Sequence, residues 1–248
     1  MTESTTTSPT QPLSLIARII GVITSPKATF ENVVAIPKPA GVLLVVALVI
    51  SVGSSIPQFT ASGRHAAIEA QVKMAERFGQ TVTPEMRTAM ETRSQSPIVR
   101  GLGIAAAFVI LPIMSLFFAA LYWAIFNTIM GGTASYKQVL AIVTHSQVIG
   151  ALGILAGLPF QLMSGTMSMS GPFNLGALAP MLAEGSKLAM FLGSINVFSL
   201  WAFIVTGIGL GVLYKRNGIK IGIALIVVFL LFMFGITSLF GSFMGRGA

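Results

Sequence analysis

Five apolar stretches, each long enough to cross a lipid bilayer, dominate the chain and decide its fold class. The hydrocarbon core of a bilayer is about 30 Å thick, which requires roughly 20 apolar residues in a helix. Backbone groups in hydrocarbon must bond within their own segment, so such stretches form helices and not open strands. The sequence therefore predicts an all-α polytopic membrane protein, a bundle of five transmembrane helices at residues 39–59, 102–130, 139–162, 188–214 and 219–243.

The composition agrees with a membrane protein and excludes several classes of function. Apolar residues make up 54% of the chain and charged residues 9%, against about 25% charged residues in soluble domains. The chain has no Cys, no Asp and only two His, so we expect no metal site, no cofactor and no disulfide framework. The net charge of +8 comes from scattered basic residues without interleaved aromatics, which does not indicate binding to nucleic acid.

The segment before the first span predicts a polar tail and two helices at the membrane surface. Residues 1–12 are rich in Thr, Ser and Pro, a composition typical of disorder. Residues 13–38 predict cytoplasmic amphipathic helices, the second with Ser25 as N-cap and Pro26 at its first position. In the first helix, five aliphatic residues share one face and Arg18 points away from it: Leu15, Ile16, Ile19, Ile20 and Ile23.

Two segments between the spans differ in charge. Residues 61–100 hold four of the seven Glu and six of the fifteen basic residues. Within this segment Gly79 ends one helical pattern and Thr83 precedes another, which predicts an extramembrane helical hairpin between the first and second spans. Residues 163–187 are rich in Ser, Gly, Met and Pro, and they either lie on the membrane or re-enter the bundle.

The distribution of Lys and Arg near the spans predicts the orientation of the chain. The basic residues of the hairpin alternate with Glu, so we give them little weight in this comparison. Most of the remaining basic residues lie on the same side as the N-terminus, which predicts the N-terminus in the cytoplasm and the C-terminus outside. The predicted location is the cell membrane. The basic residues expected to contact lipid headgroups are Arg18, Lys27, Lys38, Lys137, Lys215, Arg216 and Lys220.

Two runs of sequence resemble a known family. The first is IARIIGVITSPKATFENV at residues 16–33, and the second is GGTASYKQVLAIVTHSQVIGALGILAGLP at residues 131–159. Both are similar to bacterial members of the Yip1 family. The resemblance implies a five-span domain at residues 39–243 in the bacterial inner membrane. It also implies binding to partner membrane proteins, because the eukaryotic relatives bind such proteins and small GTPases in vesicle traffic.

Polar residues inside the apolar spans are the candidates for chemistry. His145 is the foremost, since an ionisable group at membrane depth is costly and is a functional hypothesis by default. The alternative is a neutral imidazole that hydrogen-bonds another span and has a structural role. Gln147, Asn127 and Asn196 are further candidates, either for a polar cavity or for hydrogen bonds between helices.

Glycines at a spacing of four residues predict close contacts between helices. Gly150, Gly153 and Gly157 lie along the third span, and Gly207 and Gly211 lie in the fourth. Such glycines allow two helix backbones to approach, either within one chain or between two copies.

These features favour a non-enzymatic protein, because the sequence contains none of the known catalytic motifs. We therefore expect no catalytic residue. The leading hypothesis is an adaptor or organiser that contacts the lipid bilayer and binds other membrane proteins or a second copy. No small-molecule substrate is predicted by it. The competing hypothesis is a small permease or channel with a polar track around His145.

Overall fold

The computed structural model describes residues 11–77, 79–164, 173–178, 181–182 and 186–244. The named helices in this part of the chain are α1 Leu15–Thr24, α2 Pro26–Ala35, α3 Pro39–Ser55, η1 Ile56–Phe59, α4 Ala61–Arg77, α5 Pro84–Gln95, α6 Pro97–Ala124, η2 Ile125–Ile129, α7 Tyr136–Ser164, η4 Leu175–Leu178, α8 Lys187–Ser194, α9 Val197–Tyr214 and α10 Gly218–Met244. The described residues contain five apolar helices long enough to cross a membrane, which confirms the predicted fold class.

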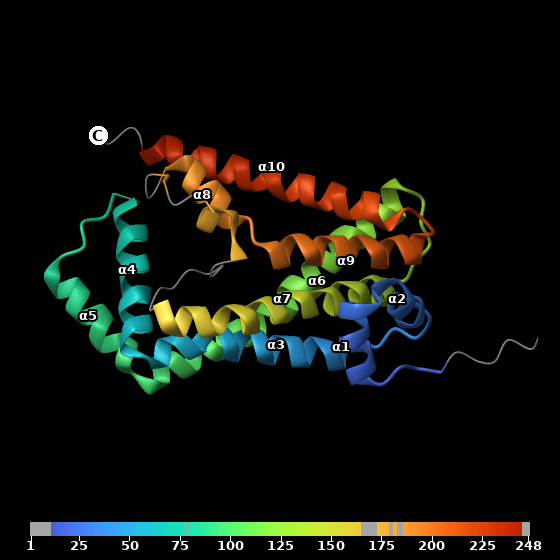
Figure 1. Cartoon of the computed structure of the whole chain (residues 1–248), viewed down its shortest axis with the longest axis horizontal. Helices are drawn as coiled ribbons and strands as arrows, with labels where there is room; N and C mark the ends of the chain where they lie inside the picture. Colours follow the sequence, from blue (N-terminus) through green and yellow to red (C-terminus); the bar gives the residue numbers. More distant parts are fainter. Residues whose placement is uncertain (1–10, 78, 165–172, 179–180, 183–185, 245–248) are drawn as a thin grey trace, which may run out of the picture.

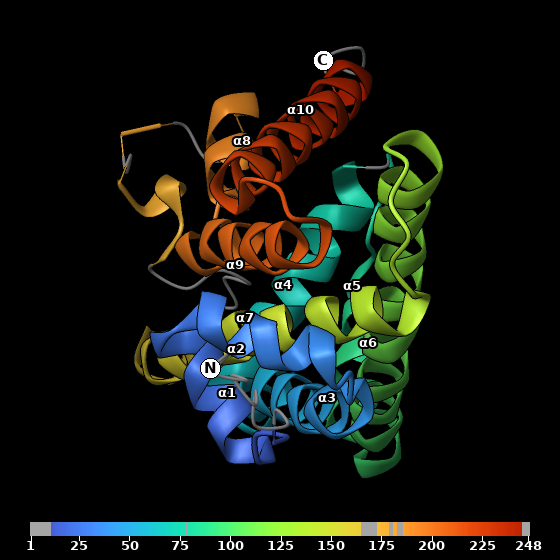
Figure 2. The same cartoon turned by 90° about the vertical axis from the view of Figure 1, so that its right-hand side faces the viewer.

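The long helix α7 is the centre of the bundle (Figures 1 and 2). It packs against α3, α6 and α9, and 56% of its most apolar 18 residues are buried. The buried share of the same window is 11% in α6 and 6% in α10. The helix α10 packs mainly on α9. Phe30, Ile142, Ile149 and Leu210 are fully buried and form part of the core around α7 and α9. The spans α6 and α10 are therefore peripheral.

The N-terminal helices cover one end of the bundle, where α1 lies across the long axis of the spans (Figure 1). The chain turns between α1 and α2 at Ser25, and Pro26 occupies the first position of α2. The orientation of α1 differs from the prediction, because Arg18 is buried while Ile16 and Ile20 are exposed. The side of α1 that carries Arg18 packs on the bundle, which leaves these two isoleucines on the outer surface.

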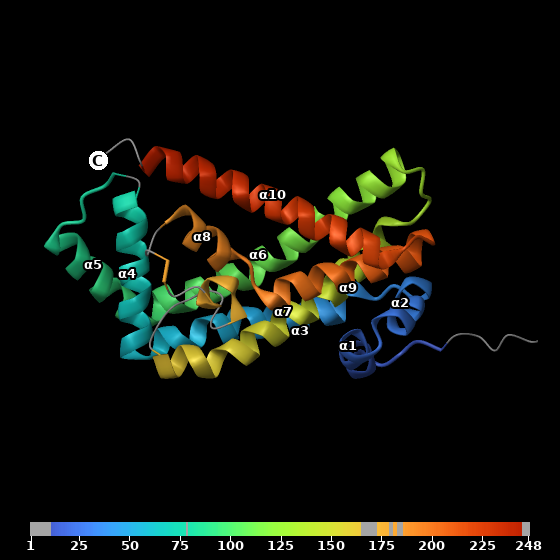
Figure 3. The same cartoon turned by 45° about the horizontal axis from the view of Figure 1, so that its top comes forward.

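The extramembrane hairpin of α4 and α5 lies at the opposite end of the bundle (Figures 1 and 3). The first helix ends before Gly79, whose φ of 76° is easily adopted only by glycine. Thr83 caps α5 by accepting a hydrogen bond from the Met86 amide, 3.3 Å away. Arg87 of α5 forms an ion pair with Glu69 of α4 and joins the two helices. These features confirm the predicted hairpin.

Two boundaries differ from those expected. The helix of the second span begins at Pro97 and not at residue 102, because Pro is favoured at the first position of a helix. Arg100 lies in its first turn, with the guanidinium 5.0 Å from the centre of the Phe59 ring. The apolar run from residue 188 is divided into α8 and α9 at Asn196, whose side chain caps α9. The expected tail falls mostly outside the described residues, and so does most of the 163–187 segment, including any re-entry into the bundle.

Candidate functional site

His145 connects the central span to the N-terminal helices. Its ring is fully buried, and Nδ1 lies 2.6 Å from the carbonyl oxygen of Ala141 one turn earlier in α7. A carbonyl oxygen only accepts hydrogen bonds, so Nδ1 carries the hydrogen and Nε2 of the neutral ring is an acceptor. That nitrogen lies 3.4 Å from Nη1 of Arg18. The imidazole therefore accepts from the guanidinium and ties α1 to α7.

Arg18 is buried at the junction of α1, α3 and α7. Only 7% of the residue is exposed, and Nη1 also donates to the carbonyl oxygen of Lys38 at 2.9 Å. This placement differs from the headgroup contact expected from sequence. The difference arises because the partners of Arg18, a carbonyl group before α3 and a ring on α7, are distant in sequence and invisible to the pattern of α1.

Gln147 faces a different neighbour from His145. It exchanges hydrogen bonds with the hydroxyl of Ser115 on α6, which lies 3.0 Å from Oε1 and 2.9 Å from Nε2. Two positions along a helix correspond to a rotation of about 200°, so the two side chains point to opposite sides of α7. The sequence interpretation missed Ser115, although a serine inside a long apolar span is a visible signal.

Asn127 of η2, which continues α6, joins this end of the second span to the end of α9. Its Nδ2 donates to the carbonyl oxygen of Ala134 at 2.7 Å, and its Oδ1 accepts from the hydroxyl of Tyr214 at 2.9 Å. The ring of Tyr214 also stacks on Phe126 with 4.8 Å between centroids. Asn196, the fourth candidate, accepts a hydrogen bond from the Phe198 amide as the N-cap of α9. Each of the four candidates therefore bonds a different set of neighbours.

Gly207 and Gly211 of the fourth span lie against the first turns of α10. A Cβ atom added to Gly207 would be 2.3 Å from the amide nitrogen of Gly222, and one added to Gly211 would be 2.5 Å from the Cα of Gly218. In the third span, a Cβ on Gly153 would be 2.8 Å from the ring of Phe198. Gly150 has nothing within 4 Å, and Gly157 has only the side chain of Gln161 at 3.8 Å. The close approaches are therefore contacts within the chain.

The remaining basic candidates are exposed and gather at the end of the bundle that α1 and α2 cover (Figure 1). Arg216 in the turn between α9 and α10 donates to the carbonyl oxygen of Met130 at 3.4 Å. The exposed basic residues are Lys27, Lys38, Lys137, Lys215, Arg216 and Lys220. This end of the protein is therefore positively charged.

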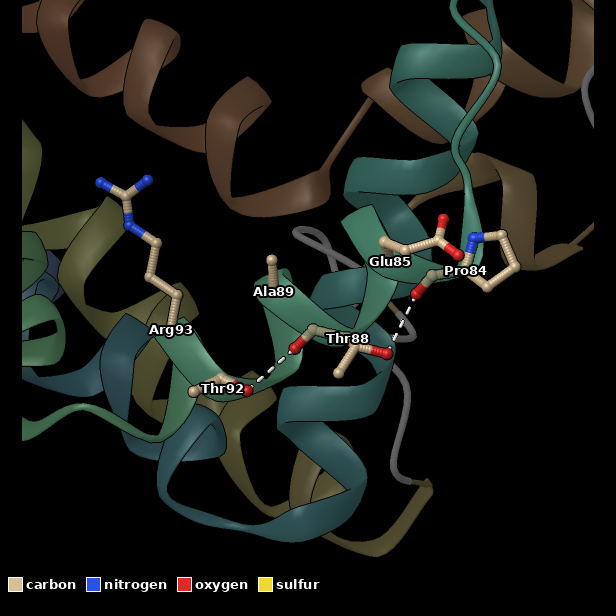
Figure 4. Close-up of a pocket in the computed structure, with 6 residues that line it drawn as sticks. All are labelled: Pro84, Glu85, Thr88, Ala89, Thr92 and Arg93. Atoms are coloured by element: carbon tan, nitrogen blue, oxygen red, sulfur yellow. Dashed lines mark hydrogen bonds between the residues drawn. The ribbon is translucent and has the colours of Figure 1, made fainter.

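A shallow hollow on the hairpin lies along one face of α5 (Figure 4). The hydroxyls of Thr88 and Thr92 in its lining donate to backbone carbonyl oxygens of the same helix, each at 3.0 Å. Its remaining lining residues are Pro84, Glu85, Ala89 and Arg93. The carboxyl group of Glu85 has a pKa below its usual value because the Thr83 side chain hydrogen-bonds it. All six lining residues come from one helix, so the hollow is open and presents no catalytic pair.

Metal binding has no visible basis in the described part of the chain, where no three His, Cys, Asp or Glu residues gather. Some polar groups of the bundle bond across helices, as Ser115 does with Gln147, and others bond a carbonyl of their own helix, as Thr206 does. The arrangement holds the spans together and presents apolar surface outward.

Comparisons with known proteins agree with this architecture. A family model described as the Yip1 domain matches residues 20–239, from α1 to α10. The chain is similar to the membrane protein YknW of Bacillus subtilis (strain 168), with 28% identity over 227 residues, which are 92% of this chain and 89% of YknW. No solved structure matches the chain. Since the family match extends over most of its length, the chain belongs to the Yip1 domain family.

Proposed function

We propose that this membrane protein is a non-enzymatic adaptor or organiser that binds other membrane proteins, or a second copy of itself, within the bilayer. The observation that carries the proposal is the small buried fraction of its two peripheral spans, α6 and α10. Only 11% of the most apolar part of α6 and 6% of that of α10 are buried, against 56% in α7. Both spans thus have faces available to another helix.

Small residues on α6 support docking of a second helix. A Cβ atom added to Gly101 or Gly103 would meet nothing within 4 Å, so a neighbouring backbone has room to approach there. Helices associate in membranes through close packing at such small residues. Large exposed side chains also lie farther along α6 and on α10, among them Phe117 and Phe232, which are 57% and 62% exposed.

The proposal includes an orientation. The N-terminus lies in the cytoplasm and the C-terminus outside, so the positively charged end of the bundle faces the anionic cytoplasmic leaflet. The exposed basic residues of this end then contact lipid headgroups, and the hairpin of α4 and α5 lies on the outer side.

Site-specific photocrosslinking in native membranes tests the docking faces. A photoreactive amino acid replaces Phe117 on α6 or Phe232 on α10, and Leu48 on α3 is the matched control because it is 55% exposed. We expect discrete protein adducts from α6 or α10, identified by mass spectrometry as a partner or as this chain itself, and none from the control. Adducts with lipid alone at all three positions would refute the proposal.

A further inference from the structure

The helix α1 has an exposed side without charged groups, formed by Ile16, Ile20 and Thr24. These residues are four positions apart and therefore lie along one face of the helix, which we call the outer face of α1. The two isoleucines are 68% and 54% exposed. The hydroxyl of Thr24 donates to the carbonyl oxygen of Ile20 at 3.1 Å, so this polar group is satisfied within the helix. The one charged residue of α1, Arg18, is buried on the opposite side.

The contacts of the buried side prevent α1 from turning its outer face inward. Arg18 donates to the carbonyl oxygen of Lys38 and to His145. One turn further along α1, Val22 is fully buried and belongs to the core. A rotation of α1 that covered the isoleucines would break both hydrogen bonds and expose Val22. The isoleucines therefore stay on the surface of the folded chain.

The helix α1 packs beside a side of α3 that faces lipid. A Cβ atom added to Gly41 in the first turn of α3 would be 3.4 Å from the side chain of Leu15. Leu44 and Leu48 follow Gly41 on the same side of α3, and they are 56% and 55% exposed. Because α3 is an apolar span, this exposed side meets acyl chains. The helix α1 thus lies at the end of a lipid-facing surface.

The two N-terminal helices differ in the side that they expose. The helix α1 lies across the long axis of the spans and at the margin of the bundle, so it is parallel to the membrane plane when the spans cross the bilayer (Figures 1 and 2). The exposed side of α2 carries Lys27 and Glu31. A charged side is stable in water, whereas an uncharged aliphatic side is stabilised at the boundary between headgroups and acyl chains. The contrast favours insertion of α1 and not of α2.

We propose that Ile16 and Ile20 insert into the leaflet that surrounds this end of the bundle, and that the acyl region of this lipid surface is the partner of α1. The outer face carries no charge, so the contact is apolar and does not require anionic lipid. The inference rests on the lipid contact that the proposed function assigns to this end of the bundle, and it adds the acyl region to that contact. It is independent of the docking faces on α6 and α10.

Spin labels on single cysteines of the full chain, reconstituted in vesicles, test this contact. The chain contains no Cys, so each variant carries one label. Ile16→Cys and Ile20→Cys report on the outer face of α1. Glu31→Cys on the exposed side of α2 is the matched control for water, and Leu48→Cys on α3 is the control for lipid. Collisions with oxygen, which dissolves among acyl chains, and with a water-soluble nickel complex locate each label.

We expect the ratio of oxygen to nickel collisions at Ile16→Cys and Ile20→Cys to be severalfold higher than at Glu31→Cys and lower than at Leu48→Cys. The same ratios are expected in vesicles of phosphatidylcholine alone and of phosphatidylcholine with phosphatidylglycerol. Both isoleucines are exposed, so neither substitution removes a buried contact, and each position tests the outer face by itself.

Three results would overturn the proposal. The first is a ratio at both isoleucine positions equal to that of Glu31→Cys, which would place the outer face in water. The second is shielding of these labels from both reagents, because a second copy of the chain would then cover α1. The third is a raised ratio only with phosphatidylglycerol, which would make the contact electrostatic. Depth in phosphatidylcholine does not depend on headgroup binding by the basic residues, and crosslinking at α6 and α10 is read separately, so either proposal can fail alone.

Discussion

Replacing Gly207 by alanine tests how closely α9 and α10 approach each other. The new Cβ atom would lie 2.3 Å from the amide nitrogen of Gly222 and 2.5 Å from the carbonyl oxygen of Gly218. Both atoms belong to the backbone of α10, so no side-chain rotation relieves the contact. The two helices must move apart.

The size of the effect follows from these distances. Ordinary contact begins at 3.4 Å, so the shortest approach falls short by about 1 Å. When the helices move apart by that distance, a gap opens elsewhere in their interface. A gap of about 1 Å loses about a quarter to a half of the dispersion attraction between the facing atoms. Overpacking typically costs about 1–3 kcal/mol, and the better helix propensity of alanine offsets about 1 kcal/mol of this. We expect Gly207→Ala to reduce the free energy of unfolding by up to about 2 kcal/mol.

Unfolding of the detergent-solubilised protein by SDS, followed by circular dichroism, measures this change. Gly150→Ala is the matched control, because an added Cβ at Gly150 meets no atom within 4 Å. The control is expected to be as stable as the wild type or up to about 1 kcal/mol more stable. Equal stability of Gly207→Ala and Gly150→Ala would refute the close approach of α9 and α10.

Three further outcomes are expected. Arg87 lowers the pKa of the Glu69 carboxyl by hydrogen-bonding it, so their link between α4 and α5 is intact above the ordinary carboxyl pKa and is lost as the pH falls through the lowered value. Spin labels on cysteines introduced into the two helices should report this opening on acidification, and Glu69→Gln should show it at neutral pH. Ser115→Ala removes the partner of Gln147 and should lower the free energy of SDS unfolding by about 0.6 kcal/mol, the average for such contacts between spans. His145→Ala should lower it by about 1–3 kcal/mol, because Arg18 loses a buried acceptor; a variant as stable as the wild type would contradict the structural role.

The spans and the hairpin were predictable from sequence because their signals are local. Hydropathy over about 20 residues identifies a membrane helix without reference to its neighbours. The end of α4 was also predictable, because Gly79 adopts a positive φ that residues other than glycine rarely adopt. Thr83 at the N-cap and Pro84 at the first position of α5 act within one turn of the chain.

The surroundings of individual polar residues could not be predicted, because they depend on partners distant in sequence. Arg18 and His145 are 127 positions apart, and nothing in the pattern of α1 indicates that a buried imidazole lies opposite it. Asn196 illustrates a second limit. It stands within a continuous apolar run and resembles an intramembrane polar residue, whereas its side chain caps a new helix and so divides the run.

The pairing of His145 with Arg18 also bears on the competing hypothesis of a permease. A residue that relays protons needs a nitrogen that can accept a proton from a path and another that can pass it on. Here Nδ1 is engaged with the Ala141 carbonyl and Nε2 faces a guanidinium, a permanent cation that repels a protonated ring. Protonation of His145 would therefore remove the acceptor at Nε2 and with it the hydrogen bond from Arg18. We therefore expect His145 to link α1 to α7 rather than to relay protons.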